Sequence, residues 1–130
     1  MRATGCLKLI VLFPLFIGII LMPALATGRG NRILYSGTVI ATAYNSLPGQ
    51  TDDSPWITAS GTRCREGVVA ANHLPIGTKV MIEGFGNRVF TVEDRMNKRY
   101  NKRIDIWFRD YDDAVKFGVR KVRYHVLASA

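Results

Sequence analysis

The chain has 130 residues and a formal net charge of +8, from 18 Lys and Arg residues against 10 Asp and Glu residues. A chain of this length forms one domain with a small core, which excludes a multidomain enzyme. The positive charge favours polyanionic partners, although the same charge also serves simply to keep a domain soluble.

The first 26 residues have the pattern of a secretory signal peptide. Arg2 and Lys8 precede an apolar run at residues 9–22. Residues 23–26 read Pro-Ala-Leu-Ala, with small residues where a signal peptidase cuts. We predict cleavage after Ala26, which lowers the formal charge from +8 to +6. The alternative is an uncleaved membrane anchor, because the apolar stretch through Ala26 has about 18 residues, the lower limit for a span.

The sequence after the signal predicts strands. Residues 27–34 form a short lead-in to a domain at residues 35–130. Alternation and frequent β-branched side chains predict a first strand that starts at Ile33, within this lead-in, and ends at Tyr44. Residues 45–55 hold turn formers such as Pro48 and Gly49, and loops of this length are often functional.

The rest of the chain predicts short, closely spaced elements. Strands are expected at residues 68–71, 78–83, 88–93, 103–108 and 119–127, and one helix is expected between a capping Asp110 and a terminating Gly118. Some six strands and one helix favour a small β-barrel. Closure removes exposed sheet edges, which suits a domain whose single remaining cysteine, Cys64, cannot form an internal disulfide. We expect Cys64 to be a buried apolar residue.

Two carboxylates differ from the others in the chain. Asp94 ends one apolar β-run, where alternation puts it on the face of Phe90 and Val92, and Asp105 interrupts another run. Burial and a second nearby carboxylate both raise a carboxyl pKa, as a general acid requires near neutral pH. The alternative is that each Asp merely accepts hydrogen bonds from backbone amides. The basic loop between them, residues 95–102, is expected to hold one carboxylate ionised or to bind an anionic substrate.

Other kinds of chemistry find little support in the sequence. It has no Gly-rich phosphate loop, and two histidines with one remaining cysteine make no metal cluster, so we expect no cofactor and no metal. The indole of Trp107 could stack on a sugar ring. The alternative interpretation is that Trp107 is simply a residue of the core.

Seven segments, in this order, resemble the 3D domain, a family named for three aspartates. They read TAY at 42–44, TASGT at 58–62, GVVAAN at 67–72, LPIGTKV at 74–80, VEDR at 92–95, RIDIWF at 103–108 and FG at 117–118. The domain occurs in bacterial cell-wall proteins, including the catalytic domain of MltA-type lytic transglycosylases and resuscitation and stationary-phase survival proteins. The resemblance covers residues 35–127.

The resemblance implies a six-stranded double-psi β-barrel with one short helix, and cleavage of the MurNAc–GlcNAc bond of peptidoglycan without water, giving a 1,6-anhydro product. It implies Asp105 as acid and base, and Asp94 as the group that polarises the acid or steadies positive charge at the sugar. Asn72 stands where the third aspartate is expected. The expected substrate-binding residues are Tyr44, Thr58, Ser60, Asn72, Arg95 and Trp107.

A second hypothesis is a non-catalytic module that binds peptidoglycan. Under either hypothesis we expect a monomer in the periplasm or outside the cell, associated with the wall. The expected partners of the protein are the glycan strands of peptidoglycan and not nucleic acid. Contact with a membrane is expected only if the signal peptide stays uncleaved.

Overall fold

The computed structural model describes residues 30–47 and 54–129. The predicted signal peptide and residues 48–53 of the predicted loop lie outside the described residues. The elements of the described part are β1 (Ile33–Tyr44), β2 (Val68–Ala70), β3 (Lys79–Ile82), β4 (Val89–Asp94), β5 (Arg103–Trp107), α1 (Tyr111–Phe117) and β6 (Arg120–Leu127). Each agrees with a predicted element to within one residue at either end.

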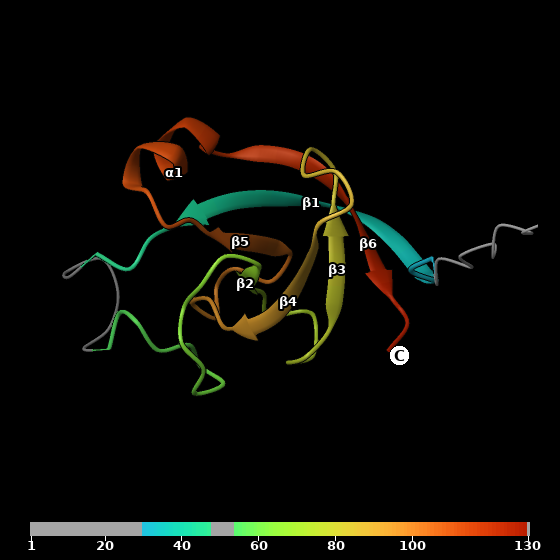
Figure 1. Cartoon of the computed structure of the whole chain (residues 1–130), viewed down its shortest axis with the longest axis horizontal. Helices are drawn as coiled ribbons and strands as arrows, with labels where there is room; N and C mark the ends of the chain where they lie inside the picture. The colour runs from blue at the N-terminus through green and yellow to red at the C-terminus, as the bar shows by residue number, and fades with distance from the viewer. Residues whose placement is uncertain (1–29, 48–53, 130) are drawn as a thin grey trace, which may run out of the picture.

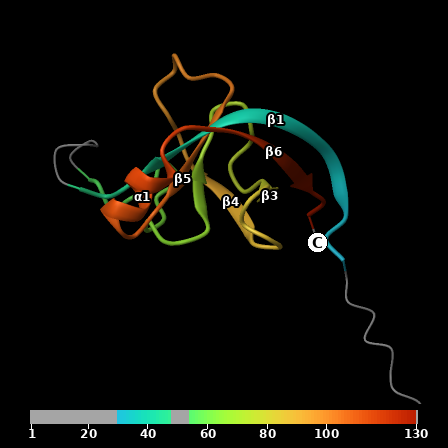
Figure 2. The same cartoon turned by 90° about the horizontal axis from the view of Figure 1, so that it is seen from above.

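The six strands of the described part close into a barrel in the order β1-β5-β2-β4-β3-β6, and α1 lies at one end (Figure 1). This confirms the mainly β barrel with one short helix. β1 and β6 pair from Ile33 opposite Leu127 to Ala41 opposite Arg120, and they run together as a curved ribbon away from α1 (Figure 2). None of the helices in the described ranges is long and apolar enough to span a membrane.

The pairing gives the barrel an approximate twofold relation between its two halves. Replacing β1, β2 and β3 by β4, β5 and β6 turns the parallel pair β1–β5 into the parallel pair β4–β2. The same exchange turns β1–β6 into β4–β3 and leaves the antiparallel pairs β2–β5 and β3–β6 in place. The sequence holds no repeat, so this symmetry belongs to the backbone.

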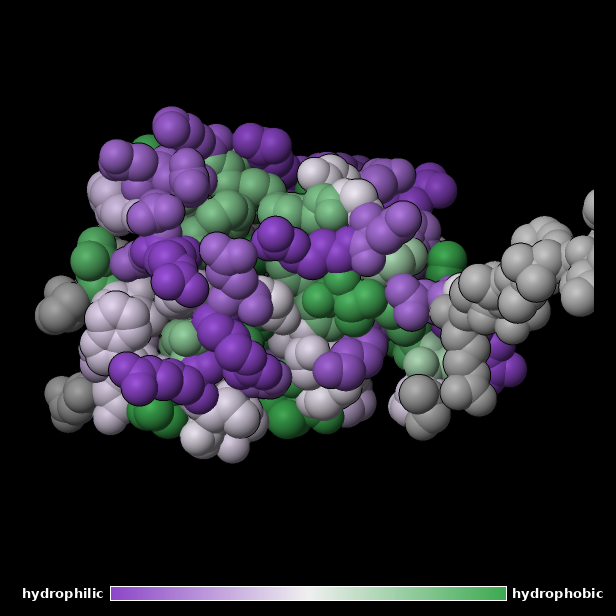
Figure 3. Space-filling model, viewed as in Figure 1, coloured by the Kyte–Doolittle hydropathy of each residue, from purple (hydrophilic) through white to green (hydrophobic). Residues whose placement is uncertain are grey.

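Alternating side chains fill the inside of the barrel. The largest fully buried ones include Phe90, Ile82, Ile104 and Ile106. Phe90 meets Phe85 edge to face, with ring centroids 5.1 Å apart. Burying one such side chain stabilises the fold by about 1.5–3 kcal/mol. The alternate positions face outward, and hydrophilic side chains cover most of the face seen in Figure 3.

Helix α1 begins and ends at the predicted residues, but the predicted side-chain cap of its first turn is absent. Asp110 occupies the N-cap position, yet its side chain makes no capping hydrogen bond, so this part of the prediction was wrong. The Asp110 side chain is exposed, and water can satisfy the first amides of the helix instead. At the other end Gly118 has a φ of 63°, a conformation that glycine adopts without strain.

Candidate active site

A groove of about 680 Å³ lies on the outside of the barrel. Its size falls in the range of ligand sites. Its lining includes both predicted acids, Asp94 and Asp105, together with Tyr44, Thr58 and Arg95. The predicted loop contributes to one wall, and the basic loop between β4 and β5 contributes to another.

Strand pairing sets the two acids in one row. Thr42 of β1 is opposite Asp105 of β5, Asp105 is opposite Ala70 of β2, and Ala70 is opposite Asp94 of β4. With strands about 4.8 Å apart, the backbones of β4 and β5 are roughly 10 Å apart. Only the methyl group of Ala70 stands between the two carboxylates, which leaves room for a ligand over β2.

A β-bulge brings Asp94 to the outer face. Val69 pairs with Val92, but the next residue, Ala70, pairs with Asp94, so Glu93 is an extra residue in β4. Regular alternation would put Asp94 on the core side with Val92, as the sequence predicted, and that prediction was wrong. One extra residue reverses the face of every residue that follows it.

The side chain of the extra residue is firmly held. Glu93 accepts two hydrogen bonds from the Arg65 guanidinium, at 2.6 and 2.7 Å, and one from Thr62 Oγ1 at 2.5 Å. The hydrogen bond from Arg65, above all, keeps the pKa of Glu93 below its ordinary value. This ion pair therefore anchors the bulge that orients Asp94.

Three donors surround Asp94. The amides of Ala59 and Arg95 both donate to Oδ1 at 2.8 Å, and the Tyr44 hydroxyl donates to Oδ2 at 3.0 Å. Asp94 therefore accepts hydrogen bonds at both of its carboxylate oxygens. Burial raises the pKa of the Tyr44 phenol, and the charge of Asp94 adds to the effect, so Tyr44 keeps its proton and donates it to this bond.

The surroundings of Asp105 differ. Thr42 Oγ1 donates to Oδ1 at 2.7 Å, and no donor within the described ranges is recorded at Oδ2. Burial raises the pKa of Asp105. The Thr42 hydrogen bond opposes this rise, the charge of Asp94 adds to it, and Arg103 opposes it. The groove therefore holds two carboxyl groups in different surroundings, since Asp94 accepts three hydrogen bonds and Asp105 has a pKa raised by burial.

Thr58 and Ser60 belong to a network of hydroxyl groups. Thr58 is buried and lines the groove, and its Oγ1 lies 2.9 Å from Ser60 Oγ and 2.8 Å from Thr62 Oγ1. Ser60 is exposed and outside the lining, and its amide donates to the Glu93 carbonyl at 3.1 Å. The structure thus places Ser60 behind the groove, where it supports the bulge.

Asn72 is also outside the groove lining. Its Nδ2 donates to the carbonyls of Met96, Asn97 and Tyr100 at 3.0, 3.0 and 3.2 Å, and its Oδ1 accepts from the Met96 amide at 3.0 Å. An amide side chain can donate and accept in this way, whereas an ionised aspartate can only accept. Asn72 therefore fixes the basic loop against the barrel.

Arg95 lines the groove, but its guanidinium is engaged. It donates to the carbonyl of Ala71 and, at 2.7 Å, to the carbonyl of Leu74. Trp107 lies away from the groove in a small cluster with Cys64 and Val68, and its Nε1 donates to Ser46 at 2.9 Å. Both faces of the indole are therefore packed, and the expected burial of Cys64 is confirmed.

Thr42, Ala70 and Tyr100 are among the residues of the groove region that were not predicted as site residues. Thr42 was detectable, because it lies two residues before Tyr44 and so shares its strand face. Tyr100 was detectable as the one aromatic residue in the basic loop. The importance of Ala70 depends on pairing with two different strands, which no local pattern indicates.

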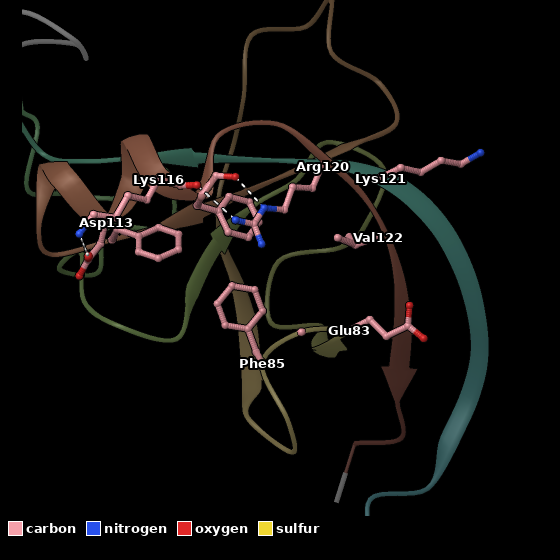
Figure 4. Close-up of a pocket in the computed structure, with 10 residues that line it drawn as sticks. Glu83, Phe85, Asp113, Lys116, Arg120, Lys121 and Val122 are labelled. Carbon is pink, nitrogen blue, oxygen red and sulfur yellow. Dashed lines mark hydrogen bonds and ion pairs between the residues drawn. The ribbon is translucent and has the colours of Figure 1, made fainter.

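A second pocket, of about 560 Å³, lies between α1, β6 and the turn after β3 (Figure 4). Phenylalanine rings form its floor, and its charged groups are mostly engaged. Lys116 lies 3.7 Å from Asp113, Arg120 donates to the carbonyls of Phe117 and Lys116, and Lys121 points away from the rings. This pocket offers no facing pair of carboxyl groups.

No known protein family matches the chain, and no curated protein matches it significantly. Among the described residues, no group of three or more His, Cys, Asp or Glu side chains is placed to hold a metal ion. The geometry of the groove is therefore the basis for the function proposed below.

Proposed function

We propose that the protein is an exported lytic transglycosylase that cleaves the MurNAc–GlcNAc bond of peptidoglycan and leaves a 1,6-anhydro product. The observation that carries this proposal is the pair of unlike carboxyl groups over Ala70 in one groove. Burial raises the pKa of Asp105, while Asp94 is held by three hydrogen-bond donors.

In the first step, Asp105 acts as a general acid. Its Oδ2 gives a proton to the glycosidic oxygen, the bond from that oxygen to C1 of the muramic acid breaks, and the N-acetylglucosamine leaves as an alcohol. Positive charge then develops at C1 and its ring oxygen. The negative charge of Asp94, held in place by Tyr44 and two backbone amides, stabilises it across the groove.

In the second step, the same group acts as a base. The 6-hydroxyl oxygen of the muramic acid attacks C1 and its proton passes to Asp105, which returns to its starting form. The Thr42 hydrogen bond stabilises the carboxylate between the two steps. Water takes no part, so the site needs one acid that changes role rather than the acid and nucleophile of a retaining hydrolase.

The double-psi topology is part of this proposal. It is supported by two parallel pairs, β1–β5 and β4–β2, which are exchanged by the approximate twofold relation. The antiparallel pair β2–β5 joins them at the centre of the site.

The proposal is tested by digesting purified peptidoglycan with the protein and identifying the products by mass spectrometry. We expect anhydro-muropeptides from the unmutated protein and a loss of roughly 10²–10⁴-fold in their rate of formation in Asp105→Asn. The matched control is Asp110→Asn, the same change at an exposed helix cap, which should leave the rate unchanged. Absence of anhydro products from the unmutated protein contradicts the proposal.

A non-catalytic wall-binding module is the second candidate. It is favoured by Asn72, which occupies the place of the expected third aspartate and is fully used in fixing the basic loop. This candidate predicts that the unmutated protein sediments with peptidoglycan yet releases no product. It fails if the protein does not sediment with peptidoglycan at moderate salt.

A further inference from the structure

The basic loop carries an aromatic ring flanked by two guanidinium groups. The Cζ atom of Arg99 lies 4.7 Å from the centroid of the Tyr100 ring, and that of Arg103 lies 4.5 Å from it. Tyr100 also lines the groove that holds Asp94 and Asp105. We call Arg99, Tyr100 and Arg103 the arginine–tyrosine cluster.

The position of this cluster is fixed by the fold. The Tyr100 carbonyl accepts from Asn72, the Tyr100 amide donates to the Asn97 carbonyl at 2.9 Å, and the Arg99 amide donates to Asn97 Oδ1 at 3.1 Å. Arg103 begins β5, two residues before Asp105. The cluster is therefore held at a set distance from the two carboxyl groups.

Within the described ranges, neither Arg99 nor Arg103 forms an ion pair. The ion pairs there are Arg65–Glu93, Arg88–Glu66 and Lys116–Asp113, although the charge of Arg103 also acts on Asp105 over a longer distance. A guanidinium held against an aromatic ring by a cation–π contact can still donate N–H groups to a ligand, and its planar fork matches a carboxylate. Stacking also restricts the side chain, so that less freedom is lost on binding.

Charge also differs along the groove. Asp94 and Asp105 lie on either side of Ala70, whereas Tyr100 brings two guanidinium groups next to another part of the lining. An anion is therefore favoured beside Tyr100 rather than over Ala70. A neutral sugar over Ala70 that carries an anionic substituent is thereby oriented with the substituent toward Tyr100.

We propose that the arginine–tyrosine cluster binds a carboxylate of the peptide stem attached to the sugar in the groove. This inference rests on the proposed function, because peptidoglycan supplies both the neutral glycan and the stem with its free carboxylates. The same cluster would also suit the phosphodiesters of wall polymers, and the experiment separates the two sources.

Binding is measured by sedimentation with three materials, using Asp105→Asn protein so that the glycan stays uncut. These are intact peptidoglycan, peptidoglycan whose free stem carboxylates have been converted to amides, and peptidoglycan stripped of phosphate polymers by acid. The test variant adds Arg99→Gln and Arg103→Gln. The control instead adds Lys116→Gln and Lys121→Gln, which remove the same charge at the second pocket. Thermal unfolding checks that each variant folds.

We expect the arginine variant to bind intact peptidoglycan about tenfold more weakly, as for the loss of a charged hydrogen bond, and to bind amidated peptidoglycan as well as its parent does. The control variant should match the parent on every material. Replacing both arginines with lysine should restore binding in part, because the charge returns without the planar edge.

Equal weakening on intact and amidated peptidoglycan, or no weakening on either, overturns the inference and leaves the proposed function standing. A loss of binding only when phosphate polymers are removed overturns it in favour of phosphate. Failure of the parent protein to bind any of the three materials overturns the proposed function and this inference with it.

Discussion

Asp105 lies between Thr42 and Ala70 on the outer face of the barrel, and burial raises its pKa. A carboxyl group whose pKa is higher in the folded than in the unfolded state stabilises the fold at low pH. That contribution is lost as the pH rises through the folded pKa. Above the folded pKa the ionised group therefore destabilises the fold, and a neutral side chain of the same shape removes this cost.

We expect Asp105→Asn to be more stable than the unmutated protein at pH 8, and this advantage to disappear as the pH falls toward the ordinary carboxyl pKa. Asparagine can still accept the Thr42 hydrogen bond, so the shape of the site is kept. Urea denaturation at a series of pH values measures the difference. If the asparagine variant is less stable at pH 8, the ionised Asp105 side chain does not destabilise the fold.

His73 contributes with the opposite sign. Its Nδ1 is buried without a hydrogen-bond partner in the described part of the chain, and its ring meets Tyr124 edge to face. Burial lowers its pKa from 6.5, and the charge of Lys102 lowers it further. The unfolded chain then binds the proton more readily, so stability is lost as the pH falls through about 6.5.

We therefore expect His73→Gln to lose less stability between pH 7 and pH 5 than the unmutated protein does. The control is His125→Gln, because the Nδ1 atom of His125 has a hydrogen-bond partner in the exposed Ser36 hydroxyl. Thermal unfolding at the two pH values makes the comparison. An unchanged pH dependence in His73→Gln would assign the effect to other groups.

At the scale of elements, the β-bulge at Glu93 links the fold to the site. The Glu93 side chain is only 11% exposed, and Arg65 is its cationic partner. Removing Arg65 leaves a largely buried carboxylate without its two charged hydrogen bonds. By contrast, Arg88 and Glu66 form a pair at 3.7 Å in which both side chains are exposed.

We expect Arg65→Gln to destabilise the fold by about 1–3 kcal/mol, and Arg88→Gln to do so by less than about 0.5 kcal/mol. Arg65→Gln should also lower the activity toward peptidoglycan, because Asp94 is oriented by the bulge. Chemical denaturation and the product assay give the two readouts. Equal stability losses in the two variants would mean that the ion pair does not anchor the bulge.

The sequence predicted the strands well because each one alternates apolar and polar residues over its own length. It also singled out Asp94 and Asp105, because a carboxylate in an apolar run has few ordinary explanations. The face of Asp94 was predicted wrongly. A bulge depends on the partner strand, and nothing in the order Val92, Glu93, Asp94 indicates which residue is the extra one.

At the scale of the whole molecule, one closed core supports the site from behind. Phe90 is among its largest fully buried side chains and contacts Phe85. We expect Phe90→Ala to cost about 3–5 kcal/mol, against a total stability of about 5–15 kcal/mol for a domain of this kind. The melting temperature should fall sharply, while Val119→Ala, at an exposed position, should leave it nearly unchanged. Similar melting temperatures for both variants would contradict this.

The order of strands around the barrel was beyond sequence reasoning, since it depends on pairs that are distant along the chain. Thr42, Asp105, Ala70 and Asp94 come from four separate strands, and only closure brings them into one row. The groove was likewise not predictable, because two loops and the small side chain of Ala70 form it together.

The approximate twofold relation has a consequence for the symmetry of the site. It exchanges Thr42 with Asp94, and Asp105 with Ala70, so each acid occupies a position whose counterpart in the other half is neutral. β4 holds one residue more than β1 at the corresponding place, because the β1–β5 register continues without a shift. A ligand in the groove therefore meets two chemically different ends, although the backbone beneath it is nearly symmetric, and its two possible directions are not equivalent.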